Sequence, residues 1–335
     1  GGLAYATVGV GMILSAILGS AQAVAAILCA VLIPEMEKDG YKKEYSGALI
    51  AASGVLGPII PPSVVFVVYS VLANVSVKKL FIAGVIPGVL LGLAFAVMIF
   101  IQSRKPDFPR TKMKFSLKRA TIAFIKAIPA LLVPVVIIGG ILTGVFTPTE
   151  SGAVAVVVAL IAGIVYGTMD WKALPNMLLR AGMSSAGILL IIAFGNIVGW
   201  TMAIDGIAGK ISAGIFALTG NYYVILLLML LIMIVVGCLM DTTAAMLVFV
   251  PVLLPIAEAI GMNLIHFGLV FCVMITIGMI TPPVGLVLFV TSNISDIPLP
   301  RLSKQILPFV LVSFAITFVM AYIPDLVMWL PEMIK

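Results

Sequence analysis

The chain has 335 residues, of which 63% are hydrophobic and 10% are charged, and its formal net charge is +6. A water-soluble protein of this length needs a far more polar surface, so the composition excludes an ordinary soluble enzyme. The charge does not indicate a nucleic-acid partner, because it gathers in one loop that holds seven Lys or Arg residues, from Arg104 to Arg119, and one acid, Asp107. We expect an all-α polytopic membrane protein, since helices satisfy every backbone polar group inside a bilayer.

The first third of the chain is a series of charge-free segments that Gly and Pro interrupt. A break at Gly19-Ser20 separates two apolar segments, and the three prolines within 57–62 cannot continue a helix. A single span needs about 20 apolar residues, which only the last segment supplies without interruption. We predict helices at 1–17, 21–34, 45–56, 63–75 and 80–102, with a charged loop at 35–44.

The apolar pattern resumes after the basic loop. We predict spans at 127–146, 152–167, 181–203 and 222–240, an amphipathic interfacial segment at 171–180, and a loop or short helix at 204–220. A break at Asp241-Thr242-Thr243 and a double proline at 282–283 interrupt the remaining apolar sequence. Around these breaks we predict helices at 244–257, 265–280, 284–293 and 305–324.

The basic loop is expected to face the cytoplasm, since Lys and Arg are concentrated in cytoplasmic loops of membrane proteins. The same segment could also lie on anionic lipid headgroups. It divides the chain into a first repeat at 1–102, a basic connector at 103–125 and a second repeat at 126–335.

The repeat is visible when the sequence is shifted by 221 residues, so that 18–87 lies on 239–308 without a gap. Four of the five prolines in the first block then fall on prolines: Pro34 on Pro255, Pro61 and Pro62 on Pro282 and Pro283, and Pro87 on Pro308. Two copies of a hydrophobic unit interrupted by Pro and Gly are typical of transporters with internal repeats. Continued to the left, the same shift predicts that about 100 further residues precede Gly1.

The helix breaks are the candidate cation sites. Unwound backbone carbonyls, hydroxyls and carboxylates bind Na⁺, and helix N-termini attract anionic groups. The alternative is ordinary helix punctuation by Gly and Pro. The candidates, taken from both copies, are Gly19, Ser20, Ala21, Gly57, Pro58, Asp241, Thr242, Thr243, Gly278 and Thr281.

Asp241 is the most informative single residue, because a carboxylate between two long charge-free segments is costly without a cation or a donor. It is either a cation ligand or gate residue, or a structural cap of the following helix. Glu150 leaves the same alternatives open at the start of its span. Hydroxyl and carboxyl groups near the breaks are candidates for the substrate path: Ser53, Ser63, Glu150, Thr276, Thr291 and Ser292. We expect no transition metal, no cofactor and no ATP hydrolysis, because no ligand cluster or phosphate-binding loop is present in the sequence.

Five motifs in order carry a resemblance: 19–21 (GSA), 57–63 (GPIIPPS), 144–150 (GVFTPTE), 240–245 (MDTTAA) and 280–285 (ITPPVG). Over nearly its whole length the chain resembles the large membrane subunit of tripartite ATP-independent periplasmic (TRAP) transporters. The resemblance implies an elevator-type carrier of the bacterial inner membrane with two inverted repeats, interrupted helices, re-entrant hairpins and a scaffold domain. It implies a small membrane subunit and a soluble periplasmic binding protein as partners. It also implies uptake of an organic acid of the dicarboxylate, keto acid or sialic acid type with Na⁺ as coupling ion.

Two other functions remain open. One is a stand-alone Na⁺- or H⁺-coupled carboxylate permease of similar architecture. The other is an ion-conducting subunit of a membrane enzyme, which favours a chain of intramembrane Lys, Glu and His residues for protons. This sequence has a single histidine, His266, and few acids within its apolar segments.

Overall fold

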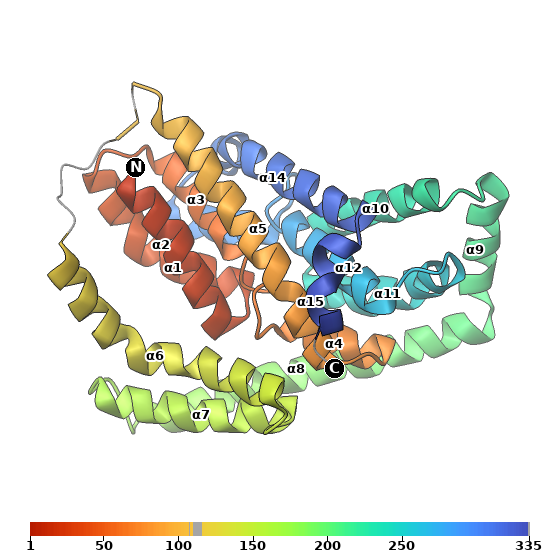
Figure 1. Cartoon of the computed structure of the whole chain (residues 1–335), viewed down its shortest axis with the longest axis horizontal. Helices are drawn as coiled ribbons and strands as arrows, with labels where there is room; N and C mark the ends of the chain where they lie inside the picture. Colours follow the sequence, from red (N-terminus) through yellow and green to blue (C-terminus); the bar gives the residue numbers. More distant parts are fainter. Residues whose placement is uncertain (107, 110–115, 334–335) are drawn as a thin grey trace. The chain divides into compact units, whose positions relative to one another are not determined.

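The computed structural model describes residues 1–106, 108–109 and 116–333, and the regular elements within them are all α-helices (Figure 1). Seven of the described helices are long and apolar enough to cross a membrane, which confirms the all-α polytopic class. The chain forms two compact units. The first unit contains Gly1–Lys112 and Met202–Lys335, and the second unit contains Met113–Thr201.

The first part of the first unit contains two helix pairs and one long helix: α1 (Gly2–Leu18), α2 (Ala21–Lys38), α3 (Lys43–Gly54), α4 (Val64–Ala73) and α5 (Val77–Ser103). The prediction that α2 ends at Pro34 was wrong, because the helix continues for one more turn. A proline removes only its own backbone donor, and the pair between Lys38 Nζ and Glu35 Oε1, 2.6 Å apart, supports the added turn.

The remainder of the first unit has the same sequence of elements: α10 (Tyr222–Leu239), α11 (Thr242–Ala259), α12 (Leu264–Gly278), α13 (Leu286–Ser295) and α14 (Leu299–Tyr322). The segment predicted as a loop or short helix is the helix α9 (Ile207–Leu218). The last helix, α15 (Asp325–Met333), was not predicted, because Pro324 and Asp325 look like the end of the apolar pattern. In the structure α15 packs against α5.

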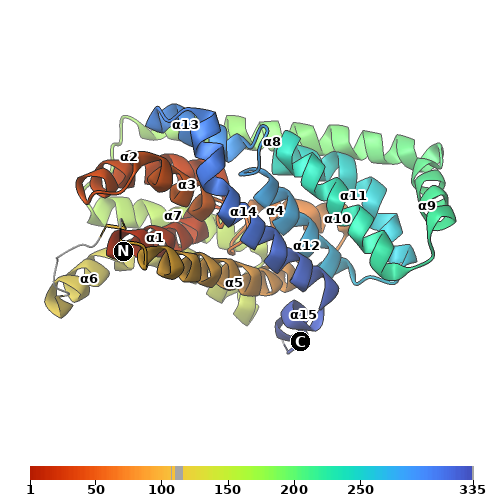
Figure 2. The same ribbon diagram turned by 90° about the horizontal axis from the view of Figure 1, so that it is seen from above.

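The 221-residue shift also relates the helices. Shifted in this way, α2 coincides with α11, and α1, α3, α4 and α5 fall on α10, α12, α13 and α14 with their starts displaced by at most one residue. The Pro61–Pro62 and Pro282–Pro283 peptide bonds are both cis. The copies also exchange partners, since α2 packs against α13 and α11 packs against α4. Figure 2 shows that α5 and α14 run in opposite directions. The inverted membrane orientation of the two copies stays a prediction.

The core of the first unit is built on α3 and α12. Every residue from Ser46 to Gly54 and from His266 to Gly278 is buried. Neither stretch contains a charged residue. A helix whose side chains are apolar or small on every face is typically buried among other helices. These two helices hold in place the unwound segments that follow them.

The second unit contains α6 (Leu117–Thr143), α7 (Pro148–Val165) and α8 (Leu174–Ile204), whose last residues pass into the first unit. Helix α6 begins ten residues before the predicted start of its span, inside the segment taken as a connector. Helix α8 is continuous, so residues 174–180 of the predicted interfacial segment and the following span form one helix. The middle of the basic loop, with Arg110, Lys112 and Lys114, lies outside the described residues.

Candidate functional site: the helix breaks

The first predicted break lies where the sequence places it. Helix α1 ends at Gly19, whose φ of 61° is a conformation that glycine adopts without strain, and the Gly19 N–H donates to Ser15 O at 3.0 Å. Ser20 is extended and is the N-cap of α2, where its Oγ accepts a hydrogen bond from the Ala23 N–H at 3.4 Å. Two apolar helices therefore meet at a short turn that carries the Ser20 hydroxyl.

The corresponding break in the second copy is formed by Asp241. Its Oδ1 accepts a hydrogen bond from the Thr243 N–H at 2.9 Å, so the carboxylate caps α11. Its Oδ2 accepts a second hydrogen bond, from Gln22 Nε2 at 3.1 Å. Asp241 is half-buried and Thr242 is buried. The structural alternative considered for Asp241 is thus present, but it occupies only one of the two carboxylate oxygens.

Gln22 joins the two breaks. The Ser20 hydroxyl donates to Gln22 Oε1 at 3.3 Å, and the Gln22 amide donates to Asp241, which forms a chain from Ser20 through Gln22 to Asp241. We call this chain the Ser20–Gln22–Asp241 bridge. It brings the N-termini of α2 and α11 together, and both carry partial positive charge. Sequence reasoning missed Gln22, although it is the only side-chain amide in the charge-free stretch 1–34.

The other two breaks adjoin the first two. A Cβ added at Gly57 lies 3.1 Å from the carbonyl carbon and oxygen of Ser20, so the segment after α3 touches the start of α2. In the second copy, the Thr242 hydroxyl donates to Met279 Sδ at 2.9 Å, and the Gly285 N–H donates to Cys238 O at 3.3 Å. In each copy the unwound segment is therefore in contact with the turn between the preceding helices.

These unwound segments supply oxygen atoms deep in the first unit. Residues 55–59 and 278–280 are buried, although most of them lie outside the helices. Their carbonyl groups, the Asp241 carboxylate and the nearby hydroxyls are the oxygen ligands that hard cations prefer. Within the described part of the chain, no group of three or more His, Cys, Asp and Glu residues could hold a metal ion. A cation at the breaks would thus be held mainly by neutral oxygen atoms.

Most of the predicted substrate-path hydroxyls bond to their own helix or loop. Ser53 donates to Leu49 O at 2.8 Å, Thr276 to Cys272 O at 2.6 Å, and Ser292 to Ile297 O at 2.6 Å. The cation-site candidate Thr281 behaves in the same way and donates to Ile277 O at 2.9 Å. Ser63 caps α4 and donates to Pro58 O. Thr291 is buried, with its hydroxyl beside the Cys29 thiol.

Glu150 belongs to the second unit and closes a capping box at the start of α7. Its Oε2 accepts a hydrogen bond from the Thr147 N–H at 2.8 Å, while Thr147 Oγ1 accepts one from the Glu150 N–H at 3.3 Å. The side chain is exposed. This geometry matches the capping alternative of the two considered for Glu150.

The sequence profile of the family described as "Tripartite ATP-independent periplasmic transporter, DctM component" matches residues 1–326. The chain is 35% identical to a putative TRAP transporter large permease protein of Haemophilus influenzae over 98% of this chain and 77% of that protein. It is 33% identical to the 2,3-diketo-L-gulonate TRAP transporter large permease protein YiaN of Escherichia coli, with coverage of 98% and 77%.

A third relative is the isethionate TRAP transporter permease protein DctMQ of Oleidesulfovibrio alaskensis, which is 36% identical over 98% of this chain. The match covers 52% of that protein, so the chain spans about half of its length. With the apolar helices and paired breaks described above, these matches show that the chain is a multi-pass inner-membrane protein of the DctM family, the large permease component of TRAP transporters.

Proposed function

We propose that the chain is the permease of a Na⁺-coupled transporter that takes up an organic acid delivered by a soluble periplasmic binding protein. The Ser20–Gln22–Asp241 bridge carries the proposal, because it couples the breaks of both copies through one carboxylate. A bound Na⁺ would balance the charge of Asp241, which is otherwise costly in a membrane. Binding of Na⁺ and of the substrate at the bridge would then determine whether the contact between the two breaks is kept or lost.

The substrate class is an organic anion. The names of two relatives contain isethionate and 2,3-diketo-L-gulonate, which are a sulfonate and a carboxylate. Helix N-termini attract such groups without a buried Arg, and those of α2 and α11 meet at the bridge. Dicarboxylates, keto acids and sialic acids likewise carry an anionic carboxylate group.

The proposed movement is of the elevator type. The first unit, with its two related sets of helices, is the part that carries substrate, and the second unit is the scaffold. Helices α6 and α7 expose much of their apolar surface, which supports contact with lipid and with a small membrane subunit. Fusion of the two membrane subunits is consistent with the extra length of the DctMQ relative.

Uptake in proteoliposomes tests the proposal. The purified transporter with its small subunit is expected to accumulate the organic anion only when an inward Na⁺ gradient and the loaded binding protein are both supplied. Replacement of Na⁺ by K⁺ is the matched control for ionic strength. Uptake that continues without the binding protein would reject this function in favour of the stand-alone permease.

A further inference from the structure

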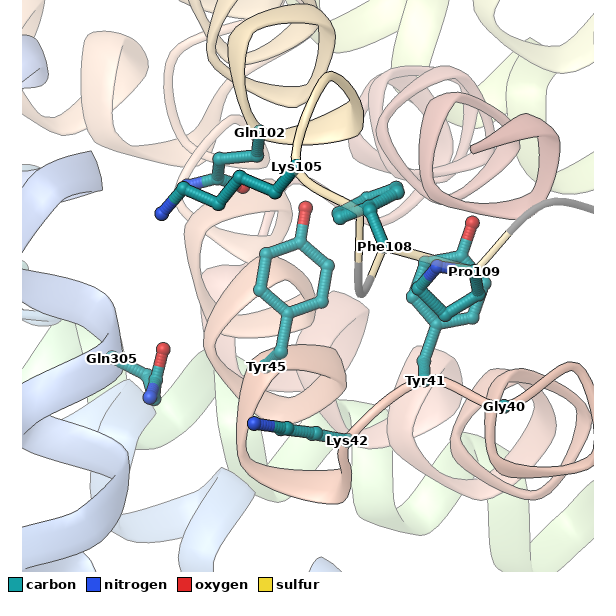
Figure 3. Close-up of a pocket in the computed structure, with 9 residues that line it drawn as sticks. All are labelled: Gly40, Tyr41, Lys42, Tyr45, Gln102, Lys105, Phe108, Pro109 and Gln305. Atoms are coloured by element: carbon teal, nitrogen blue, oxygen red, sulfur yellow. The ribbon is translucent and has the colours of Figure 1, made fainter.

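A cavity of about 360 Å³ lies at the end of the first unit, where the α2–α3 loop meets the end of α5 and the start of α14 (Figure 3). It is separate from the Ser20–Gln22–Asp241 bridge. The bridge lies at the first turn of α2 and the cavity lies beyond the last turn of that 18-residue helix. The two ends of such a helix are about 27 Å apart.

One wall of the cavity is aromatic. The rings of Tyr41 and Tyr45 are stacked with centroids 6.1 Å apart, and the Phe108 ring lies edge-on to both at 5.5 and 5.6 Å. Large rings in such contact hold each other in place. The wall is therefore a fixed surface against which a small group can be positioned.

The rest of the lining is cationic and has polar atoms without partners. Lys42 and Lys105 line the cavity, and no Asp or Glu does so among the described residues. In Figure 3 both ammonium groups project toward the side on which Gln305 lies. Tyr45 Oη and Gln102 Oε1 are buried in the wall and have no hydrogen-bond partner in the described part of the chain. Buried polar atoms are normally paired, because leaving one unpaired is costly.

The second copy shows that the fold does not require these groups. The 221-residue shift places Lys42 on Asn263 and Tyr45 on His266. Asn263 caps α12, because its Oδ1 accepts a hydrogen bond from the Ile265 N–H at 2.8 Å. His266 Nε2 forms a hydrogen bond with Met320 O at 2.9 Å. Gln102 and Lys105 fall on Ile323 and Leu326, which are apolar. The unpaired polar atoms and the lysines of the first copy thus have no equivalent at the corresponding positions of the second copy.

We propose that this cavity binds a phosphate ester that carries a neighbouring hydroxyl group, as in glycerophosphate. The phosphate oxygens accept hydrogen bonds from Lys42, Lys105 and the Tyr45 hydroxyl. The ligand hydroxyl donates to Gln102 Oε1. Lys105 is exposed, so its side chain can rotate to admit the ligand to the buried wall. The headgroup of phosphatidylglycerol and free glycerol 3-phosphate both present these groups, and the two lysines of the lining favour anions.

Binding to the intact, detergent-purified transporter tests the proposal with three probes: dioctanoyl phosphatidylglycerol, dioctanoyl phosphatidylcholine and glycerol 3-phosphate. The combined Lys42→Gln and Lys105→Gln change is expected to weaken binding of the phosphatidylglycerol probe at least about tenfold. The matched control removes two lysines from the opposite end of α5. The combined Lys78→Gln and Lys79→Gln change is expected to leave the affinity within about twofold.

A second variant does not alter charge. Gln102→Ile introduces the residue found at the related place and removes an unpaired acceptor, so the unliganded melting temperature should be unchanged or higher. It should nevertheless weaken binding of the phosphatidylglycerol probe. If glycerol 3-phosphate binds and phosphatidylglycerol does not, and the binding needs the two lysines, the ligand is a soluble phosphate ester rather than a lipid headgroup. Binding of phosphatidylcholine with the same affinity as phosphatidylglycerol would overturn the proposal. So would an affinity for phosphatidylglycerol that neither the double lysine change nor Gln102→Ile alters.

Discussion

Asp241 uses its two carboxylate oxygens differently. Oδ1 accepts the backbone N–H of Thr243 and holds the start of α11, while Oδ2 accepts the amide of Gln22 from the other copy. Hydrogen bonds to a charged acceptor are about twice as strong as neutral ones. A single side chain therefore fixes a helix end and a contact between two halves of the first unit.

Removal of the Gln22 amide tests this contact. Gln22→Leu keeps the size of the side chain but leaves Asp241 Oδ2 without its donor, so the free energy of unfolding should fall by about 1–3 kcal/mol. Denaturant titration of the purified protein measures the change. Gln305→Leu, at an exposed glutamine on α14, is the control and should shift the value by less than about 0.5 kcal/mol. Equal effects of the two changes would show that the bridge adds no stability.

The sequence predicted the bridge only in part. Ser20 and Asp241 are recognisable because each is a polar residue at a break in an apolar segment. Gln22 is not, because its contact with Asp241 joins residues 219 positions apart and its counterpart in the second copy is Thr243. A pairing over that distance is set by how the helices pack, which the local pattern does not contain.

At the scale of helices, α10 and α12 approach each other closely. A Cβ added at Gly278 lies 2.3 Å from the carbonyl carbon of Gly237, and one added at Gly237 lies 2.8 Å from Ile275 O. These neighbours are backbone atoms, which cannot rotate away as a side chain does. The position of the unwound segment after α12 therefore depends on two glycines.

Gly278→Ala should destabilise the first unit by about 1–3 kcal/mol, because the helices must separate to admit a methyl group. Gly9→Ala is the control, since a Cβ at Gly9 on α1 meets nothing within 4 Å and alanine favours a helix by about 1 kcal/mol. Melting temperatures of the two purified variants should therefore move in opposite directions. A Gly278 variant as stable as the parent would contradict the close approach.

Helix positions were predicted better than helix ends. The breaks at Gly19-Ser20 and at Asp241 were found because Gly, Ser and Asp interrupt long apolar segments. Thr242 and Thr243, which were predicted as part of the second break, are the first residues of α11 because Asp241 caps that helix. The end of α2 was missed because Pro34 was given too much weight, and the start of α6 was missed because the basic residues before it suggested a loop. Charged residues continue a helix readily where it leaves the membrane, so hydropathy does not mark its end.

At the scale of the whole chain, the repeat relates helices that exchange partners within the first unit. Each of α2 and α11 packs against the fourth helix of the other copy, and α5 and α14 run in opposite directions. An arrangement of this kind is expected of copies that cross the membrane with opposite orientation. The sequence shows the repeat but carries no sign of its direction.

Cysteine labelling at related positions tests the orientation. Glu37 and Glu258 are related by the 221-residue shift, and both are exposed near the ends of α2 and α11. With the basic loop in the cytoplasm, an impermeant thiol reagent should label Glu258→Cys but not Glu37→Cys in intact cells. Both should react after permeabilisation, and the three native cysteines are buried. Labelling of both positions from outside would exclude inverted copies.

The dependence of uptake on Na⁺ in the Asp241→Asn variant tests the central claim most directly. Asparagine keeps the shape and can still cap α11, but it removes the charge that the proposed Na⁺ balances. The matched control is Asp170→Asn, at an exposed aspartate whose Oδ1 accepts hydrogen bonds from the backbone N–H groups of Lys172 and Ala173, at 2.9 and 3.2 Å. We predict that Asp241→Asn inserts and assembles but loses Na⁺-driven uptake, that Ser20→Ala weakens the apparent Na⁺ affinity more mildly, and that Asp170→Asn transports normally. Normal uptake by Asp241→Asn with an unchanged Na⁺ dependence would mean that this carboxylate has only structural roles, as the cap of α11 and the partner of Gln22.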